Sequence, residues 1–125
     1  MACPPYLSVI PQRSTNDCCV VCVAMLLGVT YEAALLAFGA EPLQGSRTRE
    51  VRAAGKRLGV TLRWSRKFDL ETDTGMLAMR SDKWHMDHVA VLREGLIIDT
   101  DASIWEVDTY LATHDATPMS LMTVD

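Results

Sequence analysis

The segment VIPQRSTNDCCVVCVAMLLG, residues 9 to 28, places a glutamine, an acid and three cysteines at the front of an otherwise apolar stretch. If Asn16 or Asp17 caps a helix there, Cys18 lies in its first turn, where unpaired backbone N–H groups and the helix dipole favour a thiolate. Cys18 is therefore predisposed to act as a nucleophile. Cys22 lies one turn deeper, and we expect it to be a small buried hydrophobic residue.

A reactive thiolate becomes a catalyst when an imidazole holds the proton and a third group orients that imidazole. His88 and Asp99 are the best candidates for these two roles. They lie in the segment DHVAVLREGLIIDT, which reads as two strands joined by a two-residue turn at Glu94-Gly95. A hairpin would bring the two side chains toward each other.

The register of this hairpin decides which acid faces the histidine. A two-residue turn pairs Arg93 with Leu96 and, if the same register continues, His88 with Asp101. Side chains two residues apart share one face of a sheet. We therefore expect His88, Asp99 and Asp101 to point the same way, whereas a three-residue loop would reverse that relation.

Helices must place the thiol, and three are expected in the first half of the chain. The first runs from the cysteines to Gly28, a suitable residue to end a helix, and it is apolar on nearly every face, as a central core helix would be. The second, YEAALLAF, opens after Thr30 and ends at Gly39. The third begins near Ser46 or Thr48 and ends at residue 59.

Beyond residue 59 the hydrophobic period changes from helical to two. VTLRWSR and GMLAMRS are candidate strands that precede the hairpin, and a helix over WEVDTYLATH and a short strand MSLMTV follow it. Helices followed by antiparallel strands predict an α+β fold, with N-terminal helices packed on an antiparallel β-sheet. The 125 residues fit a single domain, residues 1–125.

The cysteine segment and the hairpin together resemble a known family. PQRSTNDCCVVCVAMLLG resembles the N-terminal motif of the C39 peptidases, papain-like enzymes best known for trimming leader peptides from bacteriocins, in which a glutamine precedes Asp-Cys-Gly. Gln12 lies six residues before Cys18, the spacing that papain-like enzymes keep. HVAVLREGLIIDT resembles the family's second motif, a histidine on a strand followed by a hairpin and an aspartate. The likeness covers most of residues 8 to 115.

This resemblance implies a papain-like fold and a cysteine peptidase that needs no cofactor and hydrolyses a peptide or amide bond of a peptide or protein substrate. It assigns the nucleophile, the base, the orienting acid and the oxyanion donor to Cys18, His88, Asp99 and Gln12 in that order. The family's glycine after the nucleophile is Cys19 here, so the resemblance leaves open which thiol reacts. A proline usually follows the family's aspartate, and Thr100 stands there instead, so Asp101 is an alternative acid.

Other functions fit the same scaffold. Cell-wall amidases and acyl-transfer enzymes share the papain-like fold, so the bond that is cut is less determined than the nucleophile. No transporter or ATPase segment accompanies the motifs, which favours a stand-alone enzyme over the usual setting of leader-peptide cleavage. A catalytically silent binding or regulatory domain is the rival from another class.

A zinc site is a further alternative, because Cys19 and Cys22 form a C-x-x-C and His85 and His88 form an H-x-x-H. Against it, the C-x-x-C lies inside an apolar helix, and the two histidines would face opposite sides of one strand. We expect His85 and His114 to be surface residues.

Charge and composition limit the partners and the compartment. A net charge of −4 argues against a nucleic-acid binder, which would carry a basic surplus. The longest apolar run, CCVVCVAMLLGV, is shorter than the roughly 18 residues of a membrane span, and the N-terminus lacks the pattern of a signal peptide. We therefore expect no membrane span and a cytoplasmic protein with cysteines in the thiol form.

Overall fold

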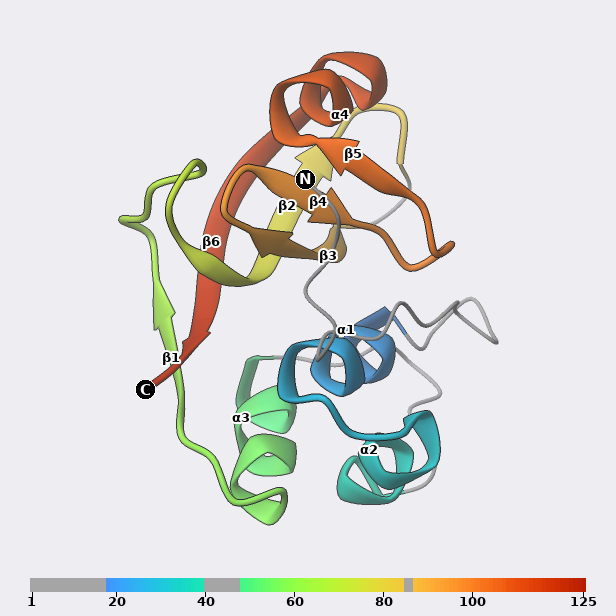
Figure 1. Ribbon diagram of the computed structural model, residues 1–125, viewed down its shortest axis with the longest axis vertical. Coiled ribbons are helices and arrows are strands. Elements are labelled where there is room, and N and C mark those ends of the chain that lie inside the picture. Colours follow the sequence, from blue (N-terminus) through green and yellow to red (C-terminus); the bar gives the residue numbers. More distant parts are fainter. Residues whose placement is uncertain (1–17, 40–47, 85–86) are drawn as a thin grey trace.

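The computed structural model describes residues 18–39, 48–84 and 87–125, which form four helices and a six-stranded sheet (Figure 1). The sheet has the order β1-β6-β2-β3-β4-β5, and each neighbouring pair is antiparallel. The predicted α+β class with an antiparallel sheet is therefore confirmed. The helices are α1 (Cys18–Leu27), α2 (Tyr31–Ala37), α3 (Thr48–Arg57) and α4 (Val107–His114). The strands are β1 (Leu62–Ser65), β2 (Thr74–Ser81), β3 (His88–Arg93), β4 (Leu96–Ile98), β5 (Ile104–Glu106) and β6 (Ala116–Val124).

The three N-terminal helices end close to the predicted positions, and α2 also begins where it was predicted. The first helix stops before Gly28, whose φ of 68° is the left-handed conformation that glycine tolerates best. Thr30 caps α2, because its side-chain oxygen accepts a hydrogen bond of 3.1 Å from the backbone N–H of Ala33. Arg57 at the end of α3 donates a hydrogen bond of 2.6 Å to the carbonyl of Ala37, which ties α3 to α2.

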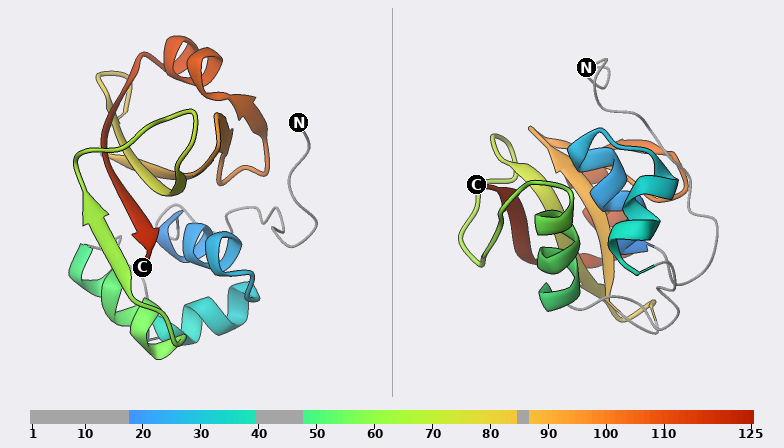
Figure 2. Two further views of the ribbon diagram at one scale, coloured as in Figure 1. Left: turned by 60° about the vertical axis from the view of Figure 1, so that its left-hand side comes forward. Right: turned by 90° about the horizontal axis from the view of Figure 1, so that it is seen from below.

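Two hydrophobic clusters lie on opposite faces of the sheet. The first joins α1, α2 and α3 to sheet residues that include Met76, Val91 and Ile98. The second contains the neighbours of these residues along the strands, such as Leu92 and Ile97, together with α4. This alternation is the period of two that a strand imposes on its side chains. Figures 1 and 2 show α1 to α3 gathered on one side and α4 at the far end of the molecule.

The hairpin between β3 and β4 has the predicted turn. Glu94 and Gly95 both have positive φ, 43° and 87°, as a two-residue type I′ turn requires. Arg93 pairs with Leu96, as expected, and the ladder continues to Val91 and Ile98. It ends there, because β4 is only three residues long.

The C-terminal part differs from the prediction in two places. Trp105 belongs to β5 rather than to the helix that follows, because it pairs with Ile97 at the edge of the sheet. Strand pairing and partial burial of the indole decide this position against its helical pattern. The last strand is nine residues long and includes Pro118, and its register with β2 shifts between Ala78 and Met79. A proline cannot donate a ladder hydrogen bond, which accounts for an irregularity at this point.

Among the described residues, no single helix has both the length and the apolar composition to cross a bilayer, although α1 and α2, bent by 116° at their junction, reach those limits when taken together.

Candidate active site

The first helix and the third strand bring Cys18 and His88 together. Cys18 is the first residue of α1, His88 is the first residue of β3, and these two elements are in contact. Cys18 is half-buried, whereas Cys19 and Cys22 are only 6% and 0% exposed. The most accessible of the described thiols is therefore the one at the histidine, and the expected burial of Cys22 is confirmed.

The surroundings of Cys18 favour the thiolate strongly. A hydrogen bond from the Cys19 side chain, followed by a hydrogen bond and the charge of His88, lowers the pKa of Cys18 from 9.0 to about 5. The backbone of Val89 contributes in the same direction, while partial burial opposes it. A thiol with this pKa is almost fully ionised at pH 7.

The imidazole of His88 is held from its other side by Asp99. The Nε2 atom of His88 lies 2.7 Å from Oδ1 of Asp99. Burial by itself would lower the pKa of His88, but the hydrogen bonds and charges of Asp99 and Cys18 outweigh it and raise the pKa to about 9. His88 is therefore an imidazolium at neutral pH, next to a thiolate.

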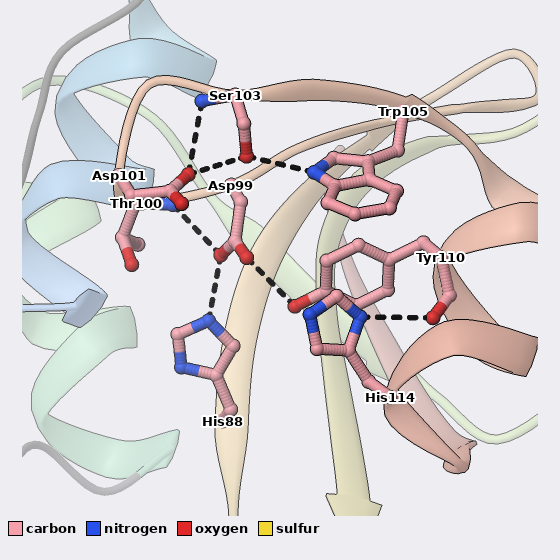
Figure 3. A network of polar contacts seen from close by, with 8 residues as sticks. All are labelled: His88, Asp99, Thr100, Asp101, Ser103, Trp105, Tyr110 and His114. Atoms are coloured by element: carbon pink, nitrogen blue, oxygen red, sulfur yellow. Dashed lines mark hydrogen bonds and ion pairs between the residues drawn. The ribbon is translucent and has the colours of Figure 1, made fainter.

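Because Nε2 is taken by Asp99, Nδ1 is the nitrogen that serves the thiol. The Cys18 side chain is also a hydrogen-bond partner of His88, and in Figure 3 the second ring nitrogen makes no contact with the other residues drawn. A histidine can then exchange a proton with sulfur through one nitrogen while the carboxylate fixes the ring through the other.

Asp99 is 9% exposed, and both oxygens of its carboxylate accept hydrogen bonds. Its Oδ1 atom accepts from the backbone N–H of Thr100 at 2.8 Å as well as from His88. The Oδ2 atom accepts from the hydroxyl of Tyr110 at 2.8 Å (Figure 3). Burial would raise the pKa of Asp99, but these three donors and the charge of His88 hold it below its usual value.

The alternative acid, Asp101, does not face His88, so the expected pairing of these residues is wrong. The chain turns out of the ladder after Ile98, and the N–H of Ala102 donates a hydrogen bond of 3.0 Å to the Asp99 carbonyl. The carboxylate of Asp101 is exposed and accepts hydrogen bonds from the backbone N–H, at 2.9 Å, and the hydroxyl of Ser103. The expected pairing assumed that the β3–β4 ladder continues past Ile98, and it therefore did not include this turn.

The other residues singled out in the sequence lie in different places. Gln12, the expected oxyanion donor, lies outside the described residues, as do His85 and the expected helix caps Asn16 and Asp17. Within residues 18–39, 48–84 and 87–125, no three His, Cys, Asp or Glu side chains are grouped to hold a metal ion. Burial also raises the pKa of Cys22, which makes it a poor metal ligand.

Sequence reasoning missed an aromatic cluster beside His88 and Asp99. The rings of Trp84 and His88 meet edge to face with centroids 5.4 Å apart. His114, expected at the surface, is half-buried, with its ring 4.2 Å from that of Tyr110. The helical spacing of Val107 and Tyr110 predicts a shared buried face, but no local pattern shows that a phenol will meet a carboxylate from another element.

No protein-family model matches this chain, and no curated protein matches it either.

Proposed function

We propose that this chain is a papain-like cysteine hydrolase of the C39 type, which cuts a peptide or amide bond through Cys18, His88 and Asp99. The observation that carries the proposal is the arrangement of these three side chains, in which a thiol of pKa about 5 meets an imidazole of pKa about 9 that a buried carboxylate orients. A structural cysteine in a core would have a raised pKa instead, as Cys22 does. A helix that carries the nucleophile and packs on an antiparallel sheet is also what a papain-like fold requires.

In the proposed reaction the Cys18 thiolate attacks the carbonyl carbon, a C–S bond forms, and the C=O electron pair moves to oxygen. Backbone N–H groups at the start of α1 are suitable donors to that oxyanion, and Gln12 is proposed as a side-chain donor on the basis of the family resemblance. The imidazolium of His88 then gives its proton to the leaving nitrogen, and the C–N bond breaks to leave a thioester.

Hydrolysis of the thioester regenerates the enzyme. His88, now neutral, removes a proton from water while the water oxygen attacks the thioester carbonyl. Collapse of the second tetrahedral intermediate releases the acid and the Cys18 thiolate, with His88 protonated again. Asp99 stays ionised and keeps the imidazole oriented in both halves of the reaction.

The experiment that tests this function is turnover with and without the nucleophile. An activated ester should give a burst of acylation at Cys18, detected by mass spectrometry, and then steady turnover. Cys18→Ala should abolish both. Cys22→Ala is the matched control, because this thiol is buried outside the proposed triad, and this variant should keep the burst.

Peptide and peptidoglycan-fragment libraries then distinguish the kinds of bond. Cleavage within peptides would support a peptidase, whereas release of peptides from the glycan part would support a cell-wall amidase. A protein that shows no Cys18-dependent acylation of the activated ester would be a silent binding domain, and the proposal would fail.

A further inference from the structure

Tyr110 makes a contact that buried tyrosines need not make. Its ring is 1% exposed, and its hydroxyl donates a hydrogen bond of 2.8 Å to Oδ2 of Asp99. The other oxygen of this carboxylate is shared by His88 and the backbone of Thr100. Tyr110 is thus the one side chain in Figure 3 that holds the oxygen turned away from the histidine.

The position of this hydroxyl is fixed by rings around it. Trp105 meets the Tyr110 ring edge-on, with centroids 5.5 Å apart at 86°, and the ring of His114 lies 4.2 Å away on α4. The indole N–H of Trp105 donates to the hydroxyl of Ser103 at 2.7 Å, in the loop that follows Asp99. The phenol is therefore tied to the same loop that carries the carboxylate.

We propose that Tyr110 is a positioning residue of the candidate site, which holds the Asp99 carboxylate at the angle that presents Oδ1 to Nε2 of His88. This inference rests on the proposed function, since it gives Tyr110 a role in the same triad. A carboxylate can rotate about its Cβ–Cγ bond, and a bond to Oδ1 alone leaves that rotation partly free. A second bond to Oδ2 removes it, so the charge and the lone pair stay aimed at the imidazole.

Packing alone would not need the hydroxyl. A phenylalanine would fill most of the same space, and burying a hydroxyl carries a cost unless it finds a partner. The partner here is the carboxylate of the triad, although the carbonyl groups of the surrounding strands are the usual acceptors for buried hydroxyls. Burial and the charge of Asp99 also raise the pKa of Tyr110, so the phenol remains a donor over the whole working pH range.

The test uses the pH dependence of Cys18 alkylation by iodoacetamide in the full chain, followed by mass spectrometry. Tyr110→Phe frees the carboxylate, weakens the His88–Asp99 contact and should raise the alkylation midpoint by about one pH unit. Tyr31→Phe is the matched control, because Tyr31 is also buried but lies in the cluster on the other face of the sheet. It should leave the midpoint unchanged.

A double-mutant cycle separates positioning from general loosening. In the Asp99→Asn background, Tyr110→Phe should have no further effect on the midpoint, because the carboxylate through which Tyr110 acts is gone. Equal shifts in both backgrounds would overturn the inference. If the phenylalanine variant does not fold, 4-fluorophenylalanine at position 110 fills the space of the hydroxyl without donating, and it should give the same shift.

The outcomes also distinguish the inference from the proposed function. A wild-type midpoint near that of an ordinary thiol would overturn both. A wild-type midpoint near pH 5 that Tyr110→Phe leaves unchanged, in a folded protein, would overturn the role of Tyr110 and leave the proposed triad standing.

Discussion

His88 Nε2 lies 2.7 Å from Asp99 Oδ1, and the two residues are brought together from the start of one strand and the end of the next. Neither residue lies in the hydrogen-bonded ladder between β3 and β4, which ends at Val91 and Ile98. The contact therefore depends on side chains that reach across the open end of a hairpin. The type I′ turn at the other end sets the register that makes this reach possible.

The first prediction is the pH range of the thiolate–imidazolium pair. Cys18 loses its proton near pH 5, and His88 keeps its proton up to about pH 9, so the pair is present between these values and is lost below and above them. Alkylation of Cys18 should therefore rise with a midpoint near pH 5, and turnover of an activated ester should follow a bell with limbs near 5 and 9. In urea-unfolded protein the alkylation midpoint should return to that of a free thiol.

Removal of the imidazole tests the cause of this shift. His88→Ala should move the midpoint of Cys18 alkylation upward by more than about one pH unit, because both a hydrogen bond and a positive charge are lost. Arg63→Ala is the control, since it removes an exposed positive charge from the edge strand β1, and it should leave the midpoint unchanged. Equal midpoints in wild type and His88→Ala would contradict an ion pair.

The second prediction concerns the residue after the proposed nucleophile. The hydrogen bond from Cys19 is the largest contribution to the low pKa of Cys18, so Cys19→Ala should raise the alkylation midpoint by about one unit. Cys19→Ser keeps a donor in nearly the same place and should stay close to wild type. If alanine and serine have the same effect, the side chain of Cys19 acts by packing and does not donate to the thiolate.

The third prediction separates the two candidate acids. Asp99→Asn should lower turnover by roughly 10²- to 10⁴-fold, because the amide no longer stabilises the imidazolium and presents the wrong group to Nε2. Asp101→Asn should change turnover little, because this carboxylate serves the turn at Ser103 and is exposed. Single-turnover acylation of each variant measures the difference, and similar losses in both would refute the assignment of Asp99.

Local sequence signals predicted the elements that position the site. Gly28 and Thr30 mark the boundary between α1 and α2 through a left-handed backbone and a side-chain cap, and both effects involve residues only a few positions apart. The turn at Glu94 and Gly95 is likewise a local property. The sequence could therefore place a thiol on the first helix and a histidine on a hairpin strand.

These local signals could not predict the contacts between elements that are distant in the sequence. The choice between Asp99 and Asp101 depends on where the chain leaves the ladder, and that in turn depends on β5 pairing back along β4. Trp105 pairs with Ile97 of β4, although the residues that flank Trp105 suit a helix. Tyr110 meets Asp99 only because α4 packs on the face of the sheet away from α1. The spacing of residues within α4 does not reveal this packing.

The last prediction tests the sheet that supports His88. Gly75 in β2 is buried, and a Cβ at this position would collide with the backbone carbonyl of Met122 in β6 and the side chain of Leu121. A backbone carbonyl in a ladder cannot move without disturbing the strand pairing, so Gly75→Ala should lower the free energy of unfolding by roughly 2–4 kcal/mol.

Gly55→Ala is the matched control for this substitution. Its Cβ would lie 2.8 Å from Cδ1 and 3.0 Å from Cγ of the buried Leu62 side chain, which must shift, but alanine favours α3 by about 1 kcal/mol over glycine and offsets this cost. Urea unfolding should therefore show that the free energy of unfolding of Gly55→Ala lies within about 1 kcal/mol of that of the wild type. Because β2 pairs with β3 along residues 74 to 79, the Gly75 variant should also shift the midpoint of Cys18 alkylation upward, whereas the Gly55 variant should not. Equal stability of the two variants would mean that β2 and β6 separate more easily than their close approach indicates.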